Sequence, residues 1–228
     1  MDNYRNKLGI DFKNATVIYC GIDLKYISDI SIESYRKKYQ IPENSLVMGH
    51  IGRWSPEKGI DFFLEICGEI NKLRQDVFFL LAGKEEKISK NYIISKAKLL
   101  GIEKNLILFN WLEDVRSILV GVDLALITSR TSEVISRAAL EFMVSGKPLV
   151  VSDVNILPEV VINGENGFVC KKDNKDEFVK KCLLILENNE LRLEMGQKSR
   201  KIVEEKYSLE KFALQHINIY EKLIKRFN

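Results

Sequence analysis

The chain has 228 residues, 46% hydrophobic and 29% charged, a composition typical of a globular protein with a sizeable core. Its net charge of only +3 argues against nucleic acid as a partner, because binding to nucleic acid requires a concentrated basic face. The four cysteines include no Cys-x-x-Cys pair, which favours buried, reduced thiols over disulfides or metal ligands. With only two histidines, a zinc site or a Ser/His catalytic triad is not expected.

Short β-branched runs alternate with helical patterns along most of the sequence. Several of these runs are apolar throughout, which indicates strands buried on both faces of a parallel sheet. We therefore predict an α/β fold, with a doubly wound, Rossmann-like parallel sheet and extra C-terminal helices. The expected strands are Thr16–Tyr19, Leu46–Ile51, Val77–Ala82, Leu106–Phe109, Leu124–Thr128, Leu149–Ser152 and Gly167–Cys170.

The helical patterns divide the rest of the chain. One helix is expected after Lys58, and the tail from Lys175 reads as helical with breaks near residues 188–189 and 207–208, where Ser208 is a candidate N-cap. We expect a loose segment at 1–15, a Rossmann-like domain at 16–207 and a separate helix at 208–228. The polar start and the lack of an apolar run of about 18 residues predict a cytoplasmic protein.

Two stretches fall at the carboxyl ends of expected strands, where open parallel sheets bind ligands. The first, HIGRWSPEKG, places Gly52 at a turn and spaces Arg53 and Lys58 five residues apart, which suits a diphosphate. The alternative is an ordinary solvent-exposed turn, and sequence alone does not separate the two. His50, two residues before Gly52, is expected to pack in the core rather than face a ligand.

The second stretch, SEVISRAALEFMVSGKP, contains Glu133 and Glu141, eight residues apart. Ser136 is expected to cap a helix that ends at Gly146, and the N–H groups of its first turn form an anion site. The spacing is too long for an i,i+4 pair, so the two carboxylates would hold opposite ends of a ligand. The alternative is two surface glutamates on a helix.

Six stretches in this order resemble the nucleotide-binding, C-terminal half of the family-four (group one) retaining glycosyltransferases, which have the GT-B fold. Three departures stand out: Cys20 in place of a linker asparagine, Asn110 in place of a glycine, and Ser136 in place of a glycine at the helix start. The stretches that carry the resemblance are VIYCGIDLKYI, GRWSPEKG, FFLLAGKEE, LILFNWLED, EVISRAALEFMVSGKPLVVSD and LPEVVINGENGFVC.

The resemblance implies roles for matching residues. Arg53 and Lys58 would hold and neutralise the diphosphate of a UDP- or GDP-linked sugar, Glu141 would bind the ribose, and Glu133 would contact the donor sugar near its anomeric carbon. The family works with retention and without a metal, and this chain has no Asp-x-Asp triplet. Other residues expected at the nucleotide are Gly52, Gly83, Leu112, Asp114, Ser136, Arg137 and Ala138.

The segment that resembles the interdomain linker begins near Val17, so the acceptor-binding Rossmann-like domain of this family is expected to be a missing domain or a partner subunit. The helix after Ser208 is expected to pack on that domain, through which the protein could also contact a membrane surface. Two other functions stay open: a non-catalytic nucleotide-sugar-binding or partner subunit, and another enzyme of the same architecture, such as a sugar-nucleotide epimerase or a phosphorylase.

Overall fold

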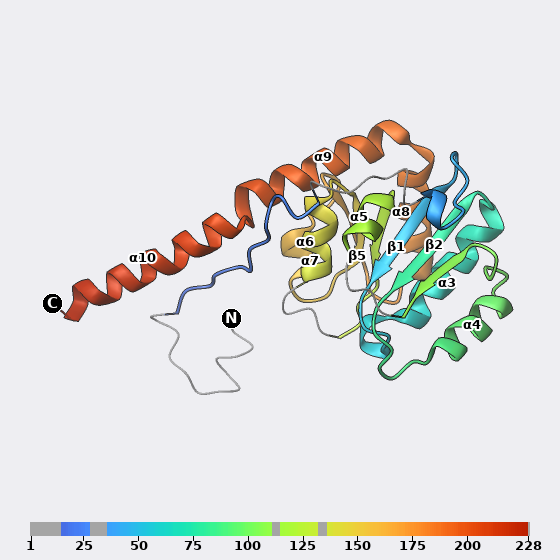
Figure 1. Cartoon of the computed structure of the whole chain (residues 1–228), viewed down its shortest axis with the longest axis horizontal. Coiled ribbons are helices and arrows are strands. Elements are labelled where there is room, and N and C mark those ends of the chain that lie inside the picture. Colours follow the sequence, from blue (N-terminus) through green and yellow to red (C-terminus); the bar gives the residue numbers. More distant parts are fainter. Residues whose placement is uncertain (1–14, 28–35, 111–114, 132–135, 228) are drawn as a thin grey trace.

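A computed structural model describes residues 15–27, 36–110, 115–131 and 136–227 (Figure 1). Six parallel strands form one sheet in the order β3-β2-β1-β4-β5-β6. This is the doubly wound arrangement that the sequence predicts. The strands are β1 (Leu46–Ile51), β2 (Val77–Ala82), β3 (Leu106–Phe109), β4 (Leu124–Ile127), β5 (Leu149–Ser152) and β6 (Gly167–Cys170).

Helices cover both faces of the sheet (Figure 1). The connections are η2 (Pro56–Lys58), α3 (Ile60–Leu73), α4 (Lys90–Leu99), α5 (Arg116–Gly121), α6 (Arg137–Val144) and α7 (Leu157–Val160), followed by α8 (Lys175–Glu187), α9 (Asn189–Lys206) and α10 (Leu209–Phe227). The breaks between α8, α9 and α10 lie where the sequence predicts them. The Ser208 hydroxyl accepts a hydrogen bond from Lys211 N at 3.3 Å, as expected of an N-cap.

The apolar strands bury alternate side chains on opposite faces of the sheet. Met48 and Phe79 pack with α3 and α8, whereas Val47 and Leu80 pack with α5 and α6. The thiols of Cys67, Cys170 and Cys182 are buried and free within these layers, as the sequence predicts, whereas Cys20 is free but only half-buried.

One predicted strand is wrong. Thr16–Tyr19 forms no strand, because this segment runs past the end of the sheet and meets the junction of α9 and α10 instead. The Tyr19 hydroxyl donates to Glu159 Oε2 at 2.6 Å, and a single bridge from Ile22, three residues further along the chain, reaches Ser208. The segment has β-branched composition but no neighbouring strand to complete a ladder.

Helix α9 lies against α6 at a point that only glycine permits. A Cβ atom on Gly196 would lie 2.2 Å from the Gly146 carbonyl oxygen, well inside van der Waals contact. Arg200 of α9 then donates to the Val144 carbonyl at 2.5 Å and to the Leu24 carbonyl at 2.9 Å. These contacts fix the amino-terminal segment and the end of α6 onto the same helix.

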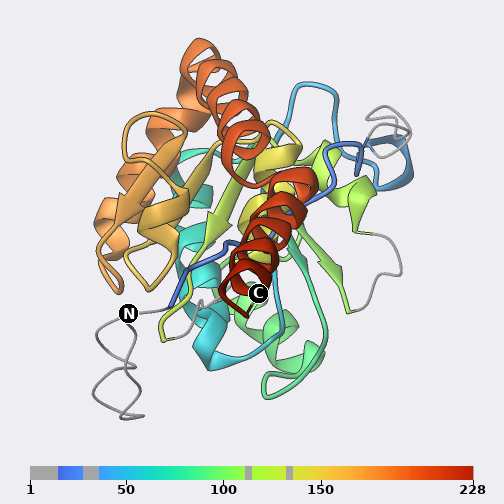
Figure 2. The same cartoon turned by 90° about the vertical axis from the view of Figure 1, so that its left-hand side faces the viewer.

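Helix α10 continues beyond the rest of the domain and is seen nearly end-on in Figure 2. No residue of α10 from Leu209 to Lys225 is buried. Large apolar side chains on it are exposed, among them Leu214, Ile217, Tyr220 and Ile224. None of the helices in the described ranges is both long and apolar enough to cross a membrane.

Candidate functional site

The centre of the sheet contains a topological switch point. Strands β1 and β4 are neighbours, yet the chain leaves β1 toward β2 on one side and leaves β4 toward β5 on the other. In open α/β sheets, the loops at the carboxyl ends of two such strands diverge and leave a crevice for ligands. Both stretches that the sequence singles out, HIGRWSPEKG and SEVISRAALEFMVSGKP, follow these two strands.

The loop after β1 is held by very close backbone contacts. Gly52 N donates to the Ala82 carbonyl at 2.9 Å, and a Cβ atom on Gly83 would lie 1.7 Å from the Gly52 carbonyl oxygen. Arg53 and Lys58 belong to this loop, at the carboxyl edge of the sheet; Arg53 is exposed and Lys58 is half-buried. The Arg53 side chain is 60% exposed and pairs with Glu86 at 2.6 Å, a partner that the sequence pattern does not reveal.

A hydroxyl joins the β1 loop to the end of β4. Thr128 Oγ1 lies 3.2 Å from the Lys58 carbonyl oxygen and 3.0 Å from the Gly59 carbonyl oxygen, which share its single proton, and Arg130 N donates to the Glu57 carbonyl at 2.9 Å. Gly59 has φ +69°, and a Cβ atom there would lie only 1.9 Å from the Thr128 carbonyl oxygen. The basic loop is therefore fixed beside the chain that leads into α6.

Helix α6 begins and ends as expected, with one correction. Ser136 occupies the N-cap position and Gly146, with φ +67°, follows the last turn. However, the Ser136 hydroxyl makes no capping hydrogen bond, and its buried Oγ has no partner among the described atoms. The first-turn N–H groups, which include Arg137 and Ala138, have no carbonyl partner inside the helix, as at any helix start.

Glu141 is buried, so the alternative of a surface glutamate is wrong for this residue. It is 6% exposed, and its Oε1 accepts a hydrogen bond from Arg137 Nε at 2.9 Å. The Tyr26 hydroxyl, from the amino-terminal segment, lies near the carboxylate. Burial raises the pKa of Glu141, and Arg137, with a smaller contribution from Tyr26, offsets only part of that rise.

His50 packs in the core, as expected. It is 1% exposed, contacts the Phe63 ring, and places Nδ1 3.0 Å from the Leu126 carbonyl. Burial lowers the pKa of His50 to about 4, so the imidazole is neutral at physiological pH. His50 therefore adds no positive charge to the loop that follows β1.

The structure brings Gly52, Arg53, Lys58, Gly83 and the start of α6 to one edge of the sheet. Glu133, Leu112 and Asp114 lie outside the described residues. Sequence reasoning missed Thr128 and Tyr26, whose roles depend on tertiary contacts, although Thr128 does end a predicted strand. In the part of the chain that the structure describes, no three His, Cys, Asp or Glu side chains are grouped to hold a metal ion.

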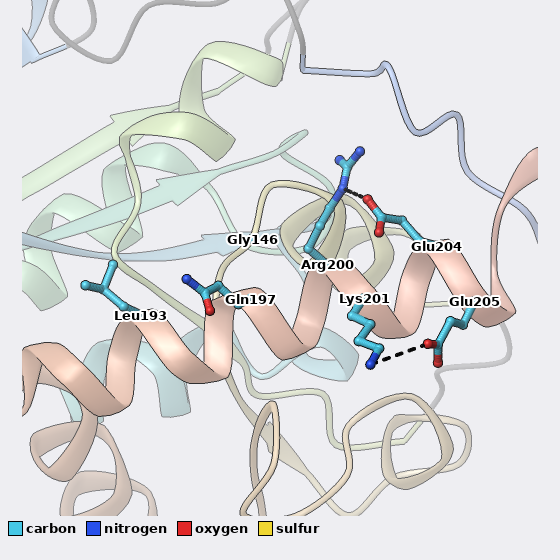
Figure 3. A pocket seen from close by; sticks show the side chains of 7 residues that line it. All are labelled: Gly146, Leu193, Gln197, Arg200, Lys201, Glu204 and Glu205. Atoms are coloured by element: carbon cyan, nitrogen blue, oxygen red, sulfur yellow. Dashed lines mark hydrogen bonds and ion pairs between the residues drawn. The ribbon is translucent and has the colours of Figure 1, made fainter.

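A groove runs along α9 (Figure 3). Gly146, after the last turn of α6, lines it together with Gln197, Arg200 and Lys201 of α9. The end of α6 faces the amino edge of the sheet, because the helices of a parallel α/β unit run antiparallel to its strands. This groove is therefore separate from the site at the carboxyl ends of β1 and β4.

Comparison with known proteins identifies the family. Residues 31–202 match the model of the glycosyl transferases group 1. The chain belongs to this family, and its sheet is the Rossmann-like domain of a GT-B fold. It is also 25% identical, over 93% of its length, to N-acetyl-alpha-D-glucosaminyl L-malate synthase of Bacillus anthracis, of which it covers 55%.

Solved structures of other glycosyltransferases share this fold. A complex of HepE from Anabaena with UDP has a TM-score of 0.86 at 21% identity, over 95% of this chain and 60% of that one. The C-terminal domain of a group 1 glycosyl transferase from Francisella tularensis has a TM-score of 0.74 at 20% identity, over 83% of this chain and 100% of that one. The chain spans about half the length of the curated relatives it matches.

Proposed function

We propose that this chain is the donor-binding domain of a retaining, metal-independent glycosyltransferase that uses a nucleotide diphosphate-sugar. The observation that carries the proposal is that two distant stretches meet at the β1–β4 switch point. One supplies Arg53 and Lys58, and the other supplies a helix start and the buried Glu141. Cations and helix N–H groups suit a diphosphate, and a carboxylate that accepts hydrogen bonds suits the ribose hydroxyls.

The proposed roles follow from this arrangement. Arg53 and Lys58 stabilise the charge that develops on the diphosphate as it leaves, a task that a divalent cation performs in other enzymes. Glu141 holds the ribose, and Glu133 contacts the donor sugar beside its anomeric carbon. Leu112 and Asp114 meet the base. The Anabaena structure with UDP supports a uridine nucleotide as the first ligand to test.

We also propose that the acceptor site belongs to a second Rossmann-like domain, in the same chain or in a partner. The relatives are longer than this chain, and α10 carries apolar side chains that nothing covers among the described residues. The α10 helix and the segment around Ile22 lie side by side, joined by the Ile22–Ser208 bridge, and would together form the connection to that domain.

Calorimetry with UDP, GDP and their nucleosides tests the donor site. Arg53→Ala combined with Lys58→Ala should weaken diphosphate binding about 100-fold, because two charge-assisted contacts are lost, but should change nucleoside binding little. Glu141→Ala should weaken binding of both. Equal losses for diphosphate and nucleoside in the double variant would refute the phosphate assignment, and a folded wild-type chain that binds neither nucleotide would refute the proposed function.

A further inference from the structure

Arg137 stands where local helix rules disfavour it. It is the first residue of α6, at the positive end of the helix dipole, where a cation is unfavourable. It also precedes Glu141 by four residues, and an i,i+4 pair is weaker when the cation comes first. A residue that violates two local preferences indicates a requirement other than helix stability.

The contacts of Arg137 show what that requirement is. Its Nε donates to Glu141 Oε1 at 2.9 Å, although the Arg137 side chain is 73% exposed and that of Glu141 only 8%. The Tyr26 side chain lies near both residues and contributes to the pKa shifts of Arg137 and Glu141. One exposed guanidinium thus holds one oxygen of a buried carboxylate.

We propose that Arg137 is a positioning residue, which holds the Glu141 carboxylate in place for a ribose. Its guanidinium also adds a third positive charge, after those of Arg53 and Lys58, to the diphosphate site. The inference rests on the proposed function. A guanidinium has five N–H donors in a planar fork, so one donor on Glu141 leaves four for other acceptors. A carboxylate has about four lone-pair positions, so the contacts from Arg137 and Tyr26 leave room for hydroxyl groups.

The charge on Glu141 depends on this contact. Burial raises the pKa of Glu141, and Arg137 is the cation that lowers it. Two other charged side chains come from described helices that pack on α6. Arg200 of α9 donates to the Val144 carbonyl at the far end of α6, and Glu159 of α7 accepts a hydrogen bond from Tyr19. Loss of Arg137 should therefore raise the pKa of Glu141 further and move ligand binding to higher pH.

The test compares Arg137→Met with Lys201→Met. Lys201 is a matched control, because it is 72% exposed and forms an i,i+4 pair with Glu205 on α9, along the separate groove (Figure 3). UDP and uridine binding would be measured by calorimetry at pH values from about 4.5, the ordinary carboxyl pKa, upward to about 9, and the ionisation of Glu141 by NMR titration of its carboxyl carbon. Arg137→Lys tests whether charge alone restores either property.

At neutral pH, Arg137→Met should weaken UDP binding about tenfold or more, and more than it weakens uridine binding, whereas Lys201→Met should change neither. Uridine binding by Arg137→Met should recover as the pH rises, in step with a raised Glu141 titration. If the wild type binds UDP but Arg137→Met matches it in affinity and pH profile, the inference is wrong. A wild-type chain that binds no nucleotide instead overturns the proposed function, a result that needs no variant.

Discussion

Gly59 offers the sharpest test of how the two loops of the site are joined. An alanine held at the Gly59 φ of +69° would lower the free energy of unfolding by about 1–2 kcal/mol. The less flexible unfolded chain of the alanine variant would offset about 0.4–1 kcal/mol of that loss. The larger cost is steric, because the new Cβ would lie 1.9 Å from the Thr128 carbonyl oxygen, and the backbone of η2 or of β4 must shift. We expect Gly59→Ala to lower the free energy of unfolding by about 3 kcal/mol or more.

Gly101→Ala is the matched control. Gly101 has φ +72°, almost the same as Gly59, but its added Cβ would have no neighbour within 4 Å. Gly101→Ala should lower the free energy of unfolding by about 1 kcal/mol or less, because only the backbone preference of glycine for a positive φ is lost. Urea unfolding followed by far-UV circular dichroism measures both variants. Equal losses of stability in the two would refute the close packing of Gly59 on Thr128, and with it the reason that the β1 loop stays beside α6.

Two further predictions concern carboxylates at the site. Glu86→Gln should strengthen UDP binding about two- to fivefold in calorimetry, because it releases Arg53 from an exposed ion pair worth under about 1 kcal/mol. The control Glu103→Gln, on an exposed turn, should leave UDP binding unchanged. Glu141→Gln should stabilise the fold at neutral pH in urea unfolding. The pKa of Glu141 is higher in the folded than in the unfolded chain, so the wild type loses stability as the pH rises from the unfolded pKa to the folded pKa. If the stability of Glu141→Gln falls with rising pH as steeply as that of the wild type, the buried charge is not its cause.

Much of the fold could be predicted because strands of a doubly wound sheet are buried on both faces. VFFLLA and LALI are apolar at every position, so β2 and β4 stand out without any alignment. Thr16–Tyr19 has a similar composition but forms no strand, because strand formation requires a neighbouring strand, which local sequence does not reveal. The helix breaks in the tail were predictable because side chains such as Asn188 and Ser208 cap the next helix locally.

The site was predictable only in part, for the same physical reason. Spacing placed Arg53 and Lys58 after one strand and Glu141 in a helix after another, because these relations are local. Strand order, which brings β1 and β4 together, is a tertiary property. So are the Thr128 hydrogen bonds and the burial of Glu141. The Ser136 cap failed at the level of its hydroxyl: Asn174 caps α8 with almost the same backbone angles, whereas the shorter Ser136 side chain makes no capping hydrogen bond.

The burial of Glu141 is itself an argument for function. A buried carboxylate costs stability, and the pKa of Glu141 stays raised in spite of Arg137 and Tyr26. An apolar or amide side chain of similar size would fill the same space in α6 at lower cost. Folding therefore gains no stability from a carboxylate at this position. Binding of a ligand rich in hydroxyl groups, by contrast, would gain hydrogen bonds from it. The site at the β1–β4 switch point thus contains a destabilising charge, and the proposed contact of Glu141 with a ribose would explain why a carboxylate stands there.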